Sequence, residues 1–303
     1  MADQYALYDF KHNDKREFLS EFDWYKSRYI NEPFDFAFNN KVICSEILRQ
    51  YIRVAENHFI KNKGIIYDFS GNLYKGADIC ENLKTYKRLI VKPFAMGKGN
   101  GVHLISYENQ HFYFDEKPAD KSQIAGYLDK NEEYVICEYI EQHKYGKELF
   151  DKTANTIRLI TMRDIESHKV KLFFAVQRIG TNHTVPVDNG SKGGLISKIN
   201  LDTGELSEAK CLHNLEIYDS HPDTGSRIKG TKIPNWEAIK EEILSVAEKL
   251  PFMDFIAWDV LVTEEGICVI EANSSSGVNI IQIWGGQKNK ELGKFFKHYK
   301  VIK

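Results

Sequence analysis

Short apolar runs separated by turn residues fill the chain from residue 86 onward, and this pattern predicts β-strands. Two of the runs occupy residues 153–163 and 170–179. A further pair lies in FIAWDVLVTEEGICVIEANSSSG, residues 255–277, on either side of a short acidic turn. Because apolar runs that flank a short turn are typical of antiparallel pairing, this last segment predicts a β-hairpin.

The turn of this hairpin decides which residues face each other. We expect a three-residue loop of Glu264, Glu265 and Gly266, with the glycine in the left-handed conformation. This loop pairs Asp259 with Glu271. Since side chains alternate along a strand, one face then carries two carboxylates, one amide and four apolar residues. These residues are Asp259, Glu271, Asn273, Ala257, Leu261, Ile267 and Val269.

The opposite face of the hairpin is largely apolar, so we expect the hairpin to be covered on both faces. That face carries Ile256, Trp258, Val260, Val262, Cys268 and Ile270. On the first face, two carboxylates in a partly buried place repel each other and need a positive partner. A divalent cation meets this need, and ligands that offer only oxygen favour Mg²⁺ or Mn²⁺ over zinc. The alternative is that lysine or arginine side chains pair with the acids.

Apolar positions at helical spacing predict helices in several places. These are residues 39–59, 120–130, 236–250 and a terminal helix from about residue 288. Residues 1–80 as a whole look mixed and mostly helical. Lys41 stands at or just before the start of the first helix, and Pro234 and Asn235 precede the helix at residues 236–250.

A strand at residues 88–94, RLIVKPF, runs into a loop with glycines at alternate positions, Gly97, Gly99 and Gly101. Alternate glycines allow successive backbone N–H groups to point at one anion such as a phosphate. Lys92 lies just before this loop. A glycine-rich hairpin turn without a ligand is the alternative. The loop is neither a P-loop nor a dinucleotide-binding motif, because no Gly-Lys-Ser/Thr follows and the next element is a strand.

Two arginines, Arg158 and Arg178, are embedded in strongly apolar strands. A buried arginine needs an anion, which is either a protein carboxylate or a phosphate or carboxylate of a ligand. The polar, glycine-rich loop at the start of residues 187–206 is either a substrate or lid loop or a plain surface loop. A further strand, YVICEYIEQH, has an apolar run that ends at Glu138, Tyr139 and Ile140.

Composition limits the function classes further. The 303 residues carry 41 basic and 43 acidic side chains, so a net charge of −2 gives no general attraction to nucleic acid. The N-terminus has no secretory signal pattern, and no apolar run is long enough to cross a membrane. The five cysteines are scattered, which favours buried reduced thiols over disulfides or metal ligands. We therefore expect a cytoplasmic protein.

The order of these motifs resembles that of the ATP-grasp superfamily. The most specific parts are LIVKPFAMGKGNGV and WDVLVTEEGICVIEANSSSG, while EYIEQH, NTIRLIT and VDNGSKGGLISKINLDTG are similar to the sugar-transfer-associated branch. The resemblance implies an α+β fold in which two α+β subdomains clasp ATP. We expect a mostly helical region at residues 1–80, a small lid subdomain at 81–142 and a C-terminal subdomain at 143–303 that carries the metal-binding hairpin.

The resemblance also implies roles for individual residues. Lys41 and Lys92 would contact the ATP phosphates, and the loop with Gly97, Gly99 and Gly101 would fold over them. The backbone of Glu138, Tyr139 and Ile140 would receive adenine. One or two Mg²⁺ ions, or Mn²⁺, would be held by Asp259, Glu271 and Asn273. These groups together would spread positive charge over the triphosphate, as phosphoryl transfer requires.

The chain departs from the family pattern at two places. Related ligases often carry an arginine two residues before the metal-binding aspartate, and this chain has Ala257 there. Arg158 or Arg178 is the candidate catalytic residue that supplies the missing charge. The acid that would bind the ribose is also not obvious, and Glu141 and Glu148 are both candidates.

The resemblance implies an ATP-dependent carboxylate–amine ligase that acts through an acyl phosphate. Its partners would be ATP, a sugar acid of surface polysaccharide biosynthesis and an amino acid or another amine. An ATP-grasp kinase that phosphorylates a hydroxyl of a sugar-like substrate is the alternative, since its nucleotide and metal groups would be the same. A non-catalytic nucleotide-binding module is disfavoured, because both lysines and all three metal-ligand positions are present. The oligomeric state stays open.

Overall fold

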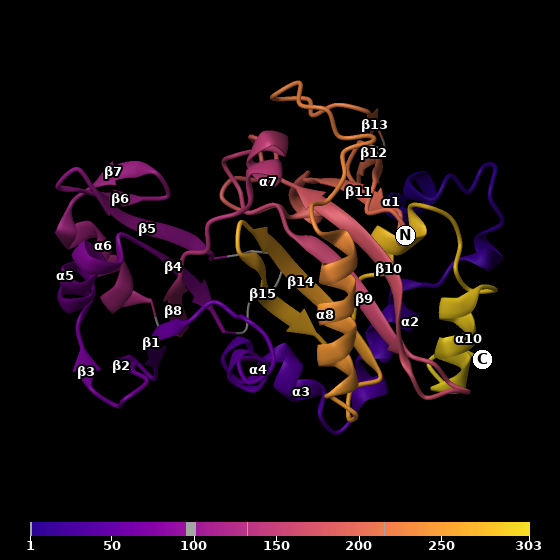
Figure 1. The fold of residues 1–303 in the computed structure, drawn as a ribbon, viewed down its shortest axis with the longest axis horizontal. Helices are drawn as coiled ribbons and strands as arrows, with labels where there is room; N and C mark the ends of the chain where they lie inside the picture. The colour runs from indigo at the N-terminus through magenta and orange to yellow at the C-terminus, as the bar shows by residue number, and fades with distance from the viewer. Residues whose placement is uncertain (1, 95–100, 132, 215) are drawn as a thin grey trace. The chain divides into compact units, whose positions relative to one another are not determined.

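The computed structural model describes residues 2–94, 101–131, 133–214 and 216–303. It divides into two compact units, each built on an antiparallel sheet (Figure 1). The small unit comprises residues 40–49 and 53–141, and the large unit comprises residues 1–39, 50–52 and 142–303. The predicted α+β class is confirmed. Residues 1–80, expected to form one mostly helical region, are divided between the two units.

The sheet of the small unit has eight strands in the order β3-β2-β1-β8-β4-β5-β6-β7. Its strands are β1 (Asn57–Asn62), β2 (Ile65–Asp68), β3 (Leu73–Tyr74), β4 (Arg88–Pro93), β5 (His103–Glu108), β6 (His111–Phe114), β7 (Lys117–Ala119) and β8 (Tyr134–Glu138). The central strands β8 and β4 pair with each other, so the strand that precedes the glycine loop lies beside the strand that ends at Glu138.

Three helices belong to the small unit, and two of them complete its core. The helices are α4 (Lys41–Leu48), α5 (Gly76–Tyr86) and α6 (Lys121–Lys130). Ile79 and Leu83 of α5 and Ile124 of α6 are fully buried against the sheet residues Leu89 and Ile136. The helices approach so closely that a Cβ at Gly76 would lie 2.4 Å from the Ala125 carbonyl oxygen, so only glycine fits there.

The helix predicted over residues 39–59 is much shorter than expected. It ends at Leu48, and residues 57–62 form strand β1 between β2 and β8. Phe59 is buried in the small core as part of this strand. Cross-strand pairing and burial in the core therefore decide the conformation of residues 57–62. These are tertiary interactions, which the local spacing of apolar residues does not reveal.

The sheet of the large unit has seven strands in the order β13-β12-β11-β10-β9-β14-β15. They are β9 (Ile157–Arg163), β10 (Val170–Ile179), β11 (Leu195–Ile199), β12 (Leu206–Cys211), β13 (Ile217–Tyr218), β14 (Phe255–Thr263) and β15 (Gly266–Asn273). Both embedded arginines thus lie on neighbouring strands, Arg158 on β9 and Arg178 on β10. The hairpin of β14 and β15 closes one edge of the sheet.

Short helices from both ends of the chain pack on this sheet. The α-helices are α1 (Ala2–Leu7), α2 (Glu21–Lys26), α3 (Asp35–Asn39), α7 (Lys144–Leu149), α8 (Trp236–Glu248), α9 (Asn279–Gln282) and α10 (Glu291–His298). The 3₁₀ turns are η1 (Lys15–Glu17), η2 (Ser27–Asn31) and η3 (Gly190–Lys192). Helix α8 lies next to β10 and begins after Asn235 as predicted, although the Asn235 side chain makes no capping bond.

The N-terminal segment is anchored in the large unit by buried amide side chains. Asn31 accepts hydrogen bonds from the backbone N–H groups of Asp254 and Phe255 at 2.8 and 3.1 Å and donates to the Phe255 carbonyl at 2.7 Å. Gln282 accepts from Leu19 N–H at 2.7 Å and donates to its carbonyl at 3.0 Å. These bonds satisfy buried backbone groups, so residues 1–39 are part of the large unit's core.

The hairpin confirms the predicted pairing of Asp259 with Glu271, but by a different route. The loop contains only Glu264 and Glu265, because Gly266 already pairs with Thr263 and has φ +140°, outside the left-handed helical region. A β-bulge at Ile270 then adds one residue to β15 and shifts the register back.

The bulge changes which residues share a face. Cys268 pairs with Leu261, and therefore lies on the Asp259 side of the strand rather than on the opposite side as predicted. Ile267 and Val269 pair with Val262 and Val260, so they lie on the face of Trp258 instead. The two-residue loop shifts the register of residues 266–269 by one position, and the bulge at Ile270 shifts it back. The faces predicted for Ile267, Cys268 and Val269 were therefore wrong, whereas the face predicted for Glu271 was correct.

All five cysteines are free and buried, as expected from their scattered positions. No helix in the described part of the chain is long and apolar enough to cross a membrane.

Candidate active site

One face of the large unit's sheet carries a row of charged residues across three adjacent strands. Arg158 on β9 pairs with Asp259 on β14, which in turn pairs with Glu271 on β15. The next pairs along the same face are Ile160 with Ala257 and Met162 with Phe255, and these belong to the main hydrophobic core. The face therefore passes from a covered apolar end to a charged end.

Asp259 lies at the centre of the charged end. Its two carboxylate oxygens accept hydrogen bonds from Arg158 Nε and Nη2 at 2.6 and 2.9 Å, which is a bidentate ion pair. Arg178 Nη1 donates to Asp259 Oδ1 at 3.2 Å, and its Nη2 donates to Asp188 Oδ1 at 2.6 Å. We call Arg158, Arg178, Asp188, Asp259 and Glu271 the charged cluster.

The cluster is nearly excluded from water, which strengthens its electrostatics. The side chains of Asp259 and Asp188 are only 9% and 6% exposed. Burial by itself raises the pKa of Asp259, but the charges of Arg158 and Arg178 outweigh it and hold this pKa below its ordinary value. Burial likewise lowers the pKa of Arg178, yet Asp188 and Asp259, with Glu271 contributing, raise it above its ordinary value.

The ion partner of Arg178 is a residue whose role the sequence did not reveal. Asp188 also accepts hydrogen bonds from Thr156 N–H at 2.7 Å and Thr156 Oγ1 at 2.6 Å, so its carboxylate is fixed on three sides. Asn189 beside it is also buried. The start of the loop at residues 187–206 is therefore part of the site rather than a plain surface loop. Its polar, glycine-rich composition was the available signal.

The two arginines have protein carboxylates as partners, which was one of the two alternatives for them. Ala257, which precedes Asp259 on the same face of β14, is buried in the main hydrophobic core. The guanidinium of Arg158 reaches the Asp259 carboxylate from the neighbouring strand β9. The geometry can stabilise negative charge next to Asp259.

Three residues offer oxygen atoms that could hold a metal ion. Asp259 pairs with Glu271, and Ala257 pairs with Asn273. Asp259, Glu271 and Asn273 therefore lie on one face of the hairpin, in two neighbouring pairs of that face. Within the described residues no three histidine, cysteine, aspartate or glutamate side chains form a metal-binding group. The cluster contains three carboxylates and two arginines. Carboxylate and amide oxygens are the ligands that a hard divalent cation prefers.

The small unit carries the residues expected to contact the nucleotide phosphates. Lys92 lies on β4 opposite Val135 of β8, on the face away from the buried Leu89 and Val91. Lys41 is the first residue of α4, as predicted, and Asn40 caps this helix by accepting from Val42 and Ile43 N–H. Gly101 has φ +69°, whereas Gly97 and Gly99 lie outside the described residues.

The segment after β8 contains the residues expected to receive adenine. Glu138 ends the strand and lies 3.6 Å from Arg53 Nη2, and Ile140 is buried. The guanidinium of Arg88 lies 5.3 Å from the ring centre of Tyr139. Of the two ribose candidates, Glu141 lies 3.4 Å from Arg88 in the small unit. Glu148 belongs to the large unit, where it pairs with Lys144 on α7.

A family model described as sugar-transfer associated ATP-grasp matches residues 22–294. The chain belongs to this family. The match extends over both units, so the two antiparallel sheets described above are the two sheets of an ATP-grasp fold. A search of curated protein sequences found no match.

Solved structures of several ATP-grasp proteins are similar to this chain at low identity. An N5-carboxyaminoimidazole ribonucleotide synthetase in complex with ADP is 12% identical and has a TM-score of 0.44, covering 80% of this chain and 46% of that one. D-alanine–D-alanine ligase from Bacillus anthracis is 15% identical with a TM-score of 0.40, covering 88% and 63%. The ATP-grasp ligase PsnB, with its precursor peptide and AMPPNP, is 12% identical with a TM-score of 0.47, covering 90% and 61%. This chain thus spans about half to two thirds of the length of these proteins.

Proposed function

We propose that this ATP-grasp chain is an ATP- and Mg²⁺-dependent carboxylate–amine ligase. It joins an amino acid or another amine to a sugar acid in the biosynthesis of a surface polysaccharide such as a capsule. Membership of the sugar-transfer-associated family supports the ATP use and the sugar context of this proposal. The two substrates and the pathway are part of the proposal.

The reaction has two steps. A carboxylate oxygen of the sugar acid attacks the γ-phosphorus of ATP, the bond to the bridging oxygen of ADP breaks, and an acyl phosphate forms. The amine then attacks the acyl carbon, inorganic phosphate leaves, and the amine nitrogen loses a proton to give the amide. Both steps place negative charge on oxygens that a positively charged site can stabilise.

The observation that carries the ligase proposal is the position of Arg158. Its guanidinium binds Asp259 in bidentate fashion, while Arg178 bridges Asp259 and Asp188. These two cations are held rigidly at the carboxylate next to which related ligases use an arginine. We assign them the role of stabilising the acyl phosphate and the tetrahedral intermediate formed from it.

Asp259, Glu271 and Asn273 are the residues that would hold Mg²⁺. When bound, the ion would neutralise part of the charge on the ATP phosphates. In the small unit, Lys92 and Lys41 would contact the phosphates, Gly97, Gly99 and Gly101 would cover them, and the backbone of residues 138–140 would bind adenine. Glu141, the ribose candidate that lies in the small unit beside this segment, would bind the ribose hydroxyls.

A kinase is the competing function, because it would need the same nucleotide and metal groups. The lack of an arginine at Ala257 favours a kinase. The guanidinium of Arg158 beside Asp259 favours the ligase, since it restores a positive charge at that place.

A hydroxylamine trapping experiment separates the two functions. We expect the protein with Mg²⁺, ATP and a panel of uronic acids to form a hydroxamate from one of them, detected by mass spectrometry. Glu271→Gln should lower hydroxamate formation about hundredfold or more, because a charged ligand of the metal is lost. Glu265→Gln, in the turn of the same hairpin, is the matched control and should keep the activity. A stable phosphate ester on a sugar hydroxyl, without hydroxamate, would refute the ligase.

A further inference from the structure

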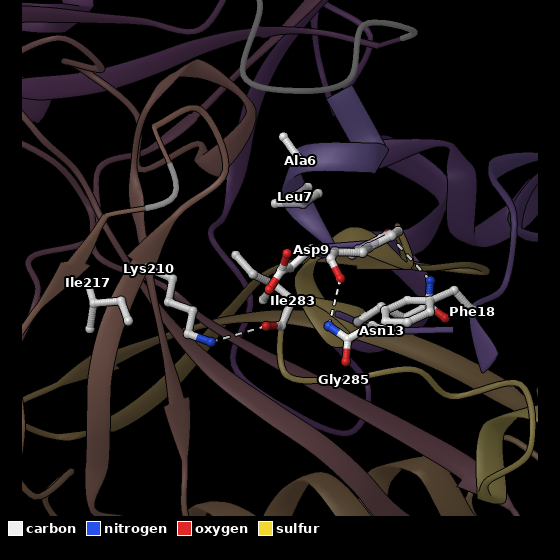
Figure 2. A pocket seen from close by; sticks show the side chains of 11 residues that line it. Ala6, Leu7, Asp9, Asn13, Phe18, Lys210, Ile217, Ile283 and Gly285 are labelled. Atoms are coloured by element: carbon white, nitrogen blue, oxygen red, sulfur yellow. Dashed lines mark hydrogen bonds between the residues drawn. The ribbon is translucent and has the colours of Figure 1, made fainter. Parts of the chain in front are cut away.

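The large unit contains a cavity of about 450 Å³ that none of the assignments above uses (Figure 2). It lies where the turn after α1 meets strand β12 and the segment after α9. Figure 2 shows Lys210 reaching it from the β12 side, while Asp9, Asn13 and Phe18 approach from the N-terminal segment. This volume is in the range of small-molecule sites, about 300–1,000 Å³.

Buried hydrogen bonds hold the walls of this cavity in place. The hydroxyl of Tyr8 donates to Asn279 Oδ1, and Gln282 binds both backbone groups of Leu19. Tyr8 also stacks on Phe18 with ring centres 4.7 Å apart. Burial raises the pKa of Tyr8 to about 12, so its hydroxyl stays a neutral donor at physiological pH. The cavity is therefore a fixed feature of the unit.

Asp9 and Lys210 supply this cavity with one carboxylate and one ammonium group. Lys210 Nζ donates to the Ile283 carbonyl at 3.2 Å and lies 4.4 Å from the ring centre of Trp284. Throughout the described ranges of the chain, no carboxylate lies within ion-pair distance of Lys210. A carbonyl and a ring face stabilise a cation only in part, so a half-buried ammonium in a cavity wall favours an anionic ligand.

The opposite wall offers hydrogen-bond acceptors. Asp9 lines the cavity, and its Oδ2 lies 2.8 Å from His12 Nδ1. Asn13 donates its amide N–H to the Tyr8 carbonyl at 2.9 Å, and this orients its own carbonyl oxygen as an acceptor. Acceptors of this kind match hydroxyl donors. Between the two walls, Phe18 and Ile283 provide apolar surface for the face of a ring.

The strand register connects the cavity to the charged cluster. Lys210 on β12 pairs with Ile196 on β11, which pairs with Arg178 on β10. Directly paired residues share a face of a sheet, so Lys210 and Arg178 project from the same face two strands apart. At about 4.8 Å per strand, their Cα atoms are about 10 Å apart.

We propose that this cavity binds a sugar acid, with its carboxylate on Lys210, its hydroxyls on Asp9 and Asn13, and its ring against Phe18 and Ile283. This site lies apart from the charged cluster, where the carboxylate that becomes phosphorylated would react, so the proposal goes beyond the ligase function. Binding itself does not depend on ATP.

Ligand-observed NMR with D-glucuronate, without nucleotide, tests the cavity. We expect saturable binding that Lys210→Met weakens about tenfold or more, because a charge-assisted contact is lost. Lys210→Arg should keep most of the affinity. D-glucose has the ring without the carboxylate. Its affinity for the unchanged protein should not exceed the affinity of glucuronate for the Lys210→Met variant. The matched control is Lys232→Met, since Lys232 lines another cavity of about 460 Å³ beside α8 and should not affect binding.

Three results would overturn the assignment. They are no saturable glucuronate binding to the unchanged protein, equal binding by Lys210→Met and Lys232→Met, or displacement of glucuronate by glycine or alanine at lower concentration. The ligase proposal fails separately. If trapping gives no hydroxamate while binding still depends on Lys210, only the ligase proposal falls. If hydroxamate forms while glucuronate binding does not depend on Lys210, only the cavity assignment falls.

Discussion

The two units of the molecule each bury a cation, but they balance its charge in different ways. In the large unit, Arg178 bridges the carboxylates of Asp188 and Asp259 at 2.6 and 3.2 Å. In the small unit, Lys61 is 2% exposed and donates to the backbone carbonyls of Leu128 and Asp129 at 2.8 and 2.7 Å. One cation is balanced by charges, and the other by the carbonyl ends of helix α6.

This difference separates a site that can do chemistry from a structural contact. The carbonyls of Leu128 and Asp129 lie in the last turn of α6, where the helix dipole favours a cation. Lys61 therefore fixes α6 on the sheet. The carboxylates beside Arg178 keep free lone pairs and can exchange partners with a ligand or metal. We expect the units to respond differently when a partner is removed.

The largest effect should follow from Asp259→Asn. This substitution leaves Arg158 and Arg178 buried without the carboxylate that they share, and breaking a buried ion pair costs about 3–5 kcal/mol of unfolding free energy. Urea unfolding, followed by tryptophan fluorescence, should show this loss in the transition of the large unit, which contains all four tryptophans.

Asp219→Asn is the control for this prediction. Asp219 is 67% exposed and lies 3.5 Å from Lys229, so its ion pair is screened by water and its removal should cost less than about 1 kcal/mol. Equal losses for the two substitutions would show that the charged cluster is not held by its buried ion pairs.

A smaller effect is expected from Lys61→Met, because its partners are neutral. The methionine retains the apolar stem and removes the buried charge together with its two hydrogen bonds, so we expect a net loss of about 1.5–3 kcal/mol in unfolding free energy. The Leu128 carbonyl keeps a hydrogen bond from the Tyr134 hydroxyl at 2.9 Å, which limits the cost. Hydrogen exchange of the α6 amides should report the loss. Lys63→Met, at an exposed turn, is the control, and equal exchange in both variants would contradict a structural role for Lys61.

The fold could be predicted where local pattern and tertiary structure agree. The apolar runs at residues 153–163 and 170–179 gave correct strands, β9 and β10, because consecutive apolar residues in both runs are buried in the core. The helix predicted at residues 39–59 failed because it ends at Leu48 and residues 57–59 pair as the start of β1. Contacts such as Asn31 with Phe255 join residues 224 positions apart, and no local pattern records them.

The site was predictable to the extent that it lies within one hairpin. Asp259 and Glu271 were paired correctly, although the bulge at Ile270 has no marker in the sequence, such as a glycine. Arg158 and Arg178 were recognised as unusual, but their partner Asp188 was not identified, since it reaches them through the fold of a loop. Lys61 attracted no attention, because one lysine in a polar-apolar run is ordinary.

The smallest effect should come from removing an exposed ion pair of the small unit. The contribution of this ion pair to stability depends on pH. Glu81 on α5 pairs with Lys121 of α6 and with Lys84, and hydrogen bonds from these two lysines lower the pKa of Glu81 from 4.5 to about 2. A carboxylate with a depressed pKa stabilises the fold above its ordinary pKa, and this contribution is lost as the pH falls from about 4.5 to 2. Glu81→Gln should therefore lower the thermal midpoint slightly at pH 7 and leave it unchanged near pH 2. A deficit that persists at pH 2 would mean that packing between α5 and α6, rather than charge, is what Glu81 contributes.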